Sequence, residues 1–290
     1  MPTIDANVRG WNQYDWHKAG EEWSLSWGNS ELQWHVTIFP RIARFLPATT
    51  VLEIAPGFGR WTHYLKDYCR ELMVVDVSPR CIEACRQRFA ANSHISYHVN
   101  DGKSLSMIPD GSIDFAFSFD SLVHVEAEAM DAYLGELARK LKPDGVGFIH
   151  HSNIGSYKRW LNLSKKLPAR MSEFLFNRGL LIKNVHWRDE TMTAKVFLDS
   201  CEHHGLQCIS QEIISWGQNY LIDCLSMFTP KTSPHRTPIK EVVNRKFMQE
   251  ASRAKKLCEL YWTDRAVLPA TPGTVRSTAW LDSESKEERL

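Results

Sequence analysis

Long apolar runs, an excess of one charge and paired cysteines are all scarce in this chain of 290 residues. No apolar stretch approaches the ~20 residues that a membrane helix requires, so we expect no membrane insertion. The first residues lack the basic and apolar segments of a secretory signal, which favours a cytoplasmic location. Lys and Arg total 35 against 34 for Asp and Glu, so nucleic acid is not the expected partner.

The seven cysteines are odd in number and include no CxxC pair. Disulfide frameworks and structural zinc sites are typical of cysteines paired at short spacings. The histidines and acidic residues likewise show no compact spacing of a known ligand motif. We therefore expect reduced, mostly buried thiols and no metal site.

The most informative feature is an apolar strand that runs into a glycine loop, Val-Leu-Glu-Ile-Ala-Pro-Gly-Phe-Gly-Arg at residues 51–60. The next apolar strand ends at Asp76, and together these indicate a pocket for a nucleoside-bearing cofactor. A dinucleotide site requires a small residue three positions after the second glycine, where this chain has Thr62. Glu53 would also repel a pyrophosphate. Carboxylates instead suit the sulfonium, amine and ribose hydroxyls of S-adenosyl-L-methionine.

Residues 49–230 alternate between apolar strands and helices, which predicts an α/β core with a doubly wound, mostly parallel sheet. Near-continuous apolar strands such as residues 72–75 fit burial on both faces. Lys142–Gly145 is predicted to be a turn before the fifth strand. The predicted strands are 51–54, 72–77, 95–99, 113–119, 146–150, 206–214 and 221–228, and the predicted helices are 60–69, 79–91, 127–141 and 191–204.

Residues 1–48 are predicted to form an N-terminal cap with a helix near residues 30–45. This segment is rich in tryptophan. One interpretation is that the tryptophans pack the cap onto the core, since aromatic side chains dominate buried area. The other is that one or two of them line a substrate pocket. The tryptophans are Trp11, Trp16, Trp23, Trp27 and Trp34.

Two further segments depart from the strand–helix alternation. Residues 154–189 mix basic and apolar side chains, and we expect an inserted helical lid. Residues 231–290 are predicted to hold a linker, a helix near 238–260 and a flexible polar tail at 282–289. The sequence leaves open whether the chain forms a homo-oligomer.

Chemically suitable residues follow four successive strands, and ligands in open α/β sheets bind beyond the carboxyl ends of the strands. Gly57 and Gly59 permit a tight turn and close approach of the backbone. Asp76 can accept both ribose hydroxyl hydrogens, Asp101 can accept from the adenine amine, and Asp120 lies beside the methionine part. Each is common alone in turns and caps, but here all four positions occur together. The predicted cofactor-binding residues are Glu53, Ala55, Gly57, Gly59, Asp76, Val77, Asp101, Gly102, Asp120 and Ser121.

The stretch from Val51 to Asn153 resembles the core of class I S-adenosylmethionine-dependent methyltransferases. The resemblance implies a seven-stranded, Rossmann-like sheet of order 3-2-1-4-5-7-6 with an antiparallel seventh strand, over residues 49–228. Ala55 departs from the family, which often has glycine there, so the loop should be stiffer than usual. The segments that carry the resemblance are 53–59, 75–76, 100–102, 114–124 and 141–145.

Transfer of a methyl group to a hydroxyl is helped by a general base, and histidine suits this role near neutral pH. His124 follows the fourth strand, where it could also be a packing residue under the cofactor. His150 and His151 end the fifth strand, and neighbours on a strand point to opposite faces, so at most one of them should face the acceptor. The predicted catalytic residues are His124, His151 and His150, and the predicted substrate-binding residues are Asn153, His186, Trp187 and Arg188.

More narrowly, residues 117–125 and 150–153 resemble bacterial methyltransferases associated with sugar or glycan modification. This likeness implies O-methylation of a carbohydrate or another small-molecule acceptor. Three alternatives stay open. N-methylation of a small amine needs a base less. RNA methylation would use the basic residues of the insertion and of the C-terminal helix. A non-catalytic binding domain would keep only the cofactor residues.

Overall fold

The computed structural model describes residues 3–217 and 219–261. The chain divides into two compact units, residues 1–255 and 256–290, and the sheet and pocket described below belong to the first. The predicted flexible tail at 282–289 lies outside the described residues. Within the described ranges, no helix combines the length and apolar character needed to cross a bilayer.

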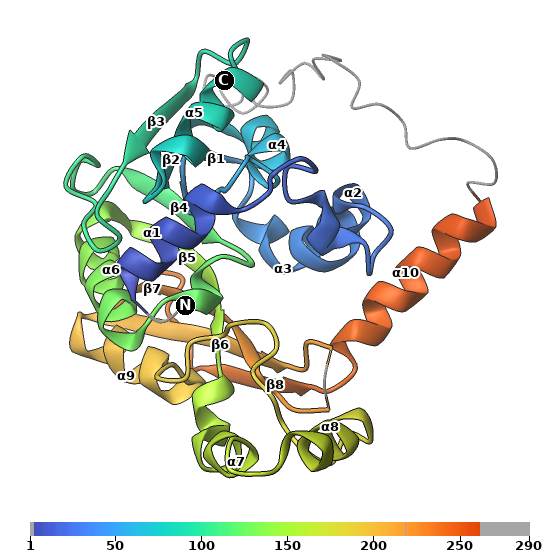
Figure 1. Ribbon diagram of the computed structural model, residues 1–290. Coiled ribbons are helices and arrows are strands. Elements are labelled where there is room, and N and C mark those ends of the chain that lie inside the picture. Colours follow the sequence, from blue (N-terminus) through green and yellow to red (C-terminus); the bar gives the residue numbers. More distant parts are fainter. Residues whose placement is uncertain (1–2, 218, 262–290) are drawn as a thin grey trace, which may run out of the picture. The chain divides into compact units, whose positions relative to one another are not determined.

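The core is one mixed sheet of eight strands in the order β3-β2-β1-β4-β5-β7-β6-β8 (Figure 1). The first seven positions follow the predicted order, and β7 runs antiparallel to both β5 and β6 as predicted. All other strands run in one direction, so their carboxyl ends meet at one edge of the sheet. The strands are β1 (Ala48–Ile54), β2 (Cys69–Asp76), β3 (Ile95–Val99), β4 (Ile113–Ser118), β5 (Leu141–Ser152), β6 (Leu206–Ile214), β7 (Asp223–Pro230) and β8 (Lys240–Asn244).

Side chains alternate along the strands and divide the core between the two faces of the sheet. On β1, Val51 belongs to one buried apolar cluster, whereas Leu52 and Ile54 belong to the other. Burial on both faces explains the near-continuous apolar sequence of this strand. Helices α6 (Ala127–Lys140) and α9 (Ala194–His203) contact each other and cover the second face.

Helix α5 (Pro79–Arg88) begins as the sequence predicts and fixes the chain where it leaves β2. Pro79 stands at the first helical position, and the Ser78 hydroxyl accepts a hydrogen bond from the Cys81 N–H at 3.2 Å. The Ser78 N–H in turn donates to Asp76 Oδ1 at 2.8 Å. The helix start therefore orients the acidic side chain that ends β2.

The N-terminal segment contains α1 (Ile4–Gln13) and then α2 (Ser30–Gln33), a π-helical turn and α3 (Phe39–Ile42) in close succession. Two of its five tryptophans pack into the core. Trp27 is fully buried and its Nε1 donates to Thr37 Oγ1 at 2.7 Å. Trp34 is also fully buried and stacks on Tyr64, with ring centroids 5.2 Å apart. For these two side chains the packing interpretation holds.

Two predictions for local structure are wrong. The predicted helix near 238–260 starts later, as α10 (Phe247–Tyr261), because residues 240–244 form β8 and pair parallel with β6. β8 is the eighth strand that the resemblance did not include, and its β-branched Val242 and Val243 suit a pleated edge. The predicted turn Lys142–Gly145 lies inside β5, which already pairs with β4 at Leu141. The remaining helices are α4 (Thr62–Leu65), α7 (Lys158–Ser164) and α8 (Ala169–Asn177).

Candidate active site

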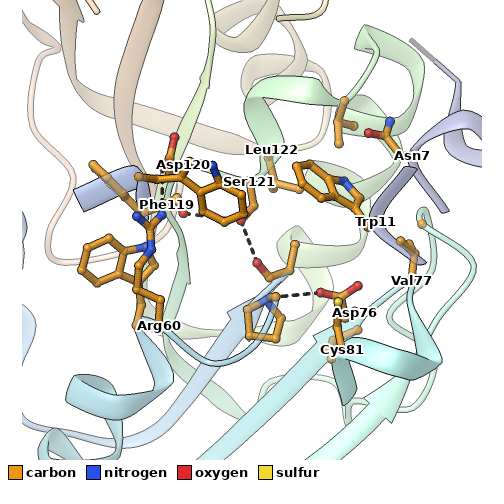
Figure 2. A pocket seen from close by; sticks show the side chains of 18 of the residues that line it. Asn7, Trp11, Arg60, Asp76, Val77, Cys81, Phe119, Asp120, Ser121 and Leu122 are labelled. Atoms are coloured by element: carbon orange, nitrogen blue, oxygen red, sulfur yellow. Dashed lines mark hydrogen bonds and ion pairs between the residues drawn. The ribbon is translucent and has the colours of Figure 1, made fainter. Parts of the chain in front are cut away.

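A pocket opens at the carboxyl ends of β1, β2 and β4, against the N-terminal segment. Its empty space is about 890 Å³, solvent-open part included. Figure 2 shows Asp76 and Trp11 on one side of the pocket and Arg60 with Asp120 on the other. The predicted site residues that line it are Ala55, Gly57, Asp76, Val77, Gly102, Asp120 and Ser121.

The two glycines of the loop have different surroundings. Gly57 lines the pocket with a φ of +59°, and a Cβ there would lie 2.7 Å from the Trp16 ring. Gly59 has a φ of +81°, and its Cβ would lie 2.5 Å from the Phe89 ring at the end of α5. The first glycine therefore shapes the pocket wall, whereas the second lets the loop pack against a helix.

Ala55 adopts the left-handed backbone conformation that favours glycine, with a φ of +59°. This conformation costs an alanine roughly 1–2 kcal/mol. Its N–H donates to the Val75 carbonyl at 2.7 Å, and its own carbonyl accepts from Ser121 Oγ at 2.7 Å. These two bonds tie the end of β1 to the chain at β2 and after β4. The departure from the resembled family's glycine thus places a strained residue on the pocket wall.

Asp76 lines the pocket, and its carboxylate has few hydrogen-bond partners. Oδ1 accepts from the Ser78 N–H at 2.8 Å and Oδ2 accepts from the Gly57 N–H at 3.3 Å. Burial raises the pKa of Asp76 to about 6, although these backbone donors lower it. Each oxygen keeps a lone pair for a ligand donor. The carboxylate can therefore accept two hydroxyl hydrogens in its charged form.

Glu53 lies behind the pocket and does not line it. Burial raises the pKa of its carboxyl to about 8, and the nearby Asp76 adds to the shift. Oε2 accepts a hydrogen bond from Thr62 Oγ1 at 2.5 Å. Oε1 is buried with no hydrogen-bond partner among the described residues. Near neutral pH this acid is thus protonated, and it links β1 to the start of α4.

Asp120 follows β4 with a φ of +62°, again in the left-handed region. Its carboxylate lies 2.8 Å from Arg60 Nη2, and its N–H donates to His150 Nδ1 at 3.1 Å. Because Nδ1 of His150 accepts, Nε2 carries the proton of the neutral ring and faces Asp223 Oδ2 at 3.4 Å. His150 is fully buried outside the pocket lining. This predicted catalytic residue therefore positions the Asp120 backbone and has no surface on the pocket.

The other two predicted catalytic histidines also lie outside the pocket lining. His151 stacks on Phe197 with ring centroids 4.3 Å apart, and its nitrogens bond to the Ser152 carbonyl and Ser226 Oγ. His124 is nearly buried, and its Nδ1 donates to the Trp187 carbonyl at 2.9 Å. Burial, with a smaller contribution from a nearby arginine, lowers the pKa of His124 to about 4.

None of the four predicted substrate-binding residues lines the pocket. Arg188 is buried and bonds both carboxylate oxygens of Asp223, at 3.0 and 2.8 Å. Asn153 uses its amide to hold the Leu221 carbonyl and the Ala194 N–H. His186 is half-buried and Trp187 is 58% exposed. Among the predicted cofactor residues, Asp101 is also outside the lining, because its carboxylate caps the N–H groups of residues 103 and 104.

The pocket wall contains side chains that the sequence did not assign to it individually. Trp11, Trp16 and Trp23 line it, and whether any of them contacts a substrate stays a prediction. Arg60 lines it with its guanidinium 5.2 Å from the Trp23 ring centroid and 4.4 Å from that of Trp61. Arg60 directly follows the glycine loop in the sequence, and this position could have indicated that it lines the pocket. The sequence does not indicate that Asn7 lines the pocket, because only the fold brings α1 to this edge of the sheet.

The pocket fits a nucleoside with a cationic thioether. Gly57 and Gly102 form a cradle that a Cβ would fill, since a Cβ on Gly102 would lie 2.9 Å from Ile4. Asp76 offers acceptor oxygens for a ribose, and indole faces attract a sulfonium. Arg60 supplies donors for a carboxylate. These features match the ribose, sulfonium and methionine carboxylate of S-adenosylmethionine.

Known proteins share this sequence pattern and fold. A family model described as a methyltransferase domain matches residues 51–145. Nodulation protein S of Sinorhizobium fredii is 33% identical over 143 residues, covering 49% of this chain and 65% of that protein. Phosphoethanolamine N-methyltransferase 1 of Triticum aestivum is 28% identical over 131 residues, covering 42% of this chain and 26% of that protein. A solved SAM-dependent methyltransferase from Leishmania major is 8% identical with a TM-score of 0.53, covering 78% of this chain and 82% of that chain.

The extent of these matches limits what they establish. The chain spans less than two thirds of the length of these curated relatives, and the solved structure shares the fold alone. The matched residues include the glycine loop, Asp76 and Asp120. Residues 51–145 therefore match a methyltransferase domain, and the pocket residues suit S-adenosylmethionine as its cofactor.

Proposed function

We propose that this chain transfers the methyl group of S-adenosylmethionine to the nitrogen of a small amine. One observation carries the choice of nitrogen. The pocket wall has carboxylates and indole rings, but no histidine among the described residues lines it. A neutral amine already has a nucleophilic lone pair, whereas a hydroxyl depends on a base.

The cofactor, when bound, supplies a methyl group on a positively charged sulfur. Asp76 accepts hydrogen bonds from the ribose, and the bare backbone of Gly57 lets the ligand approach the loop. Arg60 and Asp120 hold each other at 2.8 Å and fix the far wall. Such positioning of two reactants can supply ~7–11 kcal/mol of the barrier to methyl transfer.

The wall also suits an amine acceptor. Trp11, Trp16 and Trp23 line it with indole rings, and such rings stabilise the ammonium that forms when a neutral amine accepts the methyl group. Glu126 adds a carboxylate at the same wall. The Triticum aestivum relative carries N-methyltransferase in its name, which supports nitrogen as the acceptor atom.

A second candidate, methylation of a hydroxyl on a sugar, glycan or other small molecule, rests on His124. Since its Nδ1 donates to the Trp187 carbonyl, Nε2 of the neutral ring is free of a proton. The ring lies 5.4 Å from that of Trp11, which lines the pocket. A shift of Trp11 would be required to expose His124 to an acceptor.

A methyl-transfer assay with labelled cofactor separates the two candidates. Matched acceptors that differ only in amine or hydroxyl are supplied to the wild type and to His124→Ala. We expect transfer to the amine, a rate that rises as the amine loses its proton, and little effect of the substitution on that rate. His151→Ala serves as the matched control, because His151 is buried away from the pocket. Transfer to the hydroxyl alone, lost in His124→Ala, would establish the second candidate in place of the first.

A further inference from the structure

Helices α7 and α8 both expose large apolar side chains to solvent. They lie consecutively at the lower edge of Figure 1, joined by residues 165–168. In α8, Ser172 is the buried residue, whereas Met171 and Phe174 point to solvent. In α7, Trp160 is 61% exposed and Leu163 is exposed on the same face. A surface helix normally turns its apolar stripe inward, so the arrangement in α8 is inverted, whereas α7 buries Leu161 and exposes a second apolar face.

The apolar residues of each helix form a stripe. Trp160 and Leu163 are three positions apart, as are Met171 and Phe174, and residues at this spacing are neighbours on a helix surface. Leu180 follows α8 and is 65% exposed. A partner is therefore expected to cover these residues, because isolated exposed apolar side chains are common but paired stripes are not.

The same segment is strongly basic. Residues 158–180 hold six Lys or Arg residues and one acidic residue, in a chain whose net charge is +1. Among the described residues, Lys158, Arg159, Lys166 and Arg170 form no ion pair, and all four are exposed. Arg178 lies over the Phe174 ring, 4.4 Å from its centroid. Cations thus flank both apolar stripes.

We propose that the α7–α8 segment, residues 158–180, docks on an anionic lipid surface. Tryptophan, phenylalanine and leucine enter the boundary between headgroups and acyl chains, while lysine and arginine attract anionic headgroups. Charge complementarity favours lipid, since the free cations surround the apolar stripes on both helices. The proposal is independent of the acceptor that the pocket methylates.

Cosedimentation of the full chain with vesicles tests the proposal. One vesicle set is phosphatidylcholine alone, and the other contains about a third phosphatidylglycerol, which supplies anionic headgroups for the basic residues. We expect binding to the anionic vesicles and release when salt is raised to about 0.5 M, where screening is strong. Equal binding to both vesicle sets, or none to either, would overturn the proposal.

Substitutions locate the contact. Trp160→Ser with Phe174→Ser should lower partitioning about tenfold, since two exposed apolar side chains no longer enter the interface. Lys166→Glu with Arg170→Glu should lower it about tenfold or more. Val243→Ser on β8 and the pair Arg253→Glu with Lys255→Glu are the matched controls, because these residues are exposed elsewhere. Unchanged binding in both α7–α8 variants, with intact circular dichroism, would contradict the assignment.

Discussion

Asp76 and Asp223 lie at the same edge of the sheet, yet their surroundings make them opposites. Asp76 ends β2, holds two backbone N–H groups and lines the pocket. Asp223 begins β7 and is fully buried, and Arg188 binds both its oxygens while burial opposes ionisation. The arginine and His150 hold the pKa of Asp223 well below its usual range. An acid without a cationic partner can bind a ligand, whereas a paired acid stabilises the fold.

Breaking the ion pair between Arg188 and Asp223 should have the largest effect on stability. Arg188→Ala leaves Asp223 buried and unpaired, and we expect the free energy of unfolding to fall by about 3–5 kcal/mol. Urea unfolding measures this. Lys165→Ala is the control from the same region, because its pair with Glu190 is exposed and should contribute less than about 1 kcal/mol. Similar losses in both variants would mean that the buried pair has no special role.

A second test concerns Glu53, whose pKa is about 8 when folded and 4.5 in the unfolded chain. Between these values the folded state binds more protons, so its stability falls as pH rises from 4.5 towards 8. Glu53→Gln removes this loss, and at pH 7 the variant should be more stable than the wild type by about 3 kcal/mol.

The advantage of Glu53→Gln should shrink as pH falls towards 4.5. Thermal unfolding across this pH range gives the comparison, and Glu71→Gln on the exposed side of β2 is the control. A constant difference at every pH would show that Glu53 does not titrate with folding.

The third prediction concerns Asp76, the acid that lines the pocket without a cationic partner. Asp76→Ala removes a charged acceptor from the pocket and should weaken S-adenosylmethionine binding by roughly 1.5–3 kcal/mol. Since the charged form accepts the ribose hydroxyls, wild-type affinity should also decline below a pH of about 6. Calorimetry measures both effects. Asp101→Ala should leave affinity unchanged, because Asp101 caps its own loop away from the pocket. Equal affinity in wild type and Asp76→Ala would remove Asp76 from the site.

The smallest effect is expected at Ala55. Ala55→Gly relieves the left-handed strain but adds freedom to the unfolded chain, so the net gain in stability should be below about 1 kcal/mol. Ala116→Gly in the middle of β4 is the counterpart, and it should destabilise the protein because no strain is relieved there. Denaturant midpoints distinguish the two. A loss in both variants would mean that Ala55 is not strained.

The sequence predicted the elements whose apolar pattern is strong and whose partners are near in the chain. The bounds predicted for β3 and β6 match the structure, and α5 begins at the predicted residue, Pro79. β8 was mistaken for helix, since its Val242 and Val243 are exposed on an edge strand and no buried face marks them. Local pattern thus predicts buried elements better than exposed edge strands.

The tryptophans and histidines show the same limit within the site. The sequence grouped the five tryptophans of residues 1–48, but the fold sends Trp27 and Trp34 into the core and the other three to the pocket. It also placed three histidines near strand ends. Strand position does not fix which face a side chain meets, and none of the three lines the pocket.

The sequence by itself determined the alternating α/β core, the glycine loop and the acids at the strand ends, because apolar periodicity and turn residues act over short stretches of chain. Only the tertiary structure decided which acid stays open to a ligand. Asp120 and Asp223 are each paired with a cation from a distant position: Arg60 is 60 residues from Asp120, and Arg188 is 35 residues from Asp223. Burial and pairing of charges depend on such long-range contacts, which no local pattern encodes.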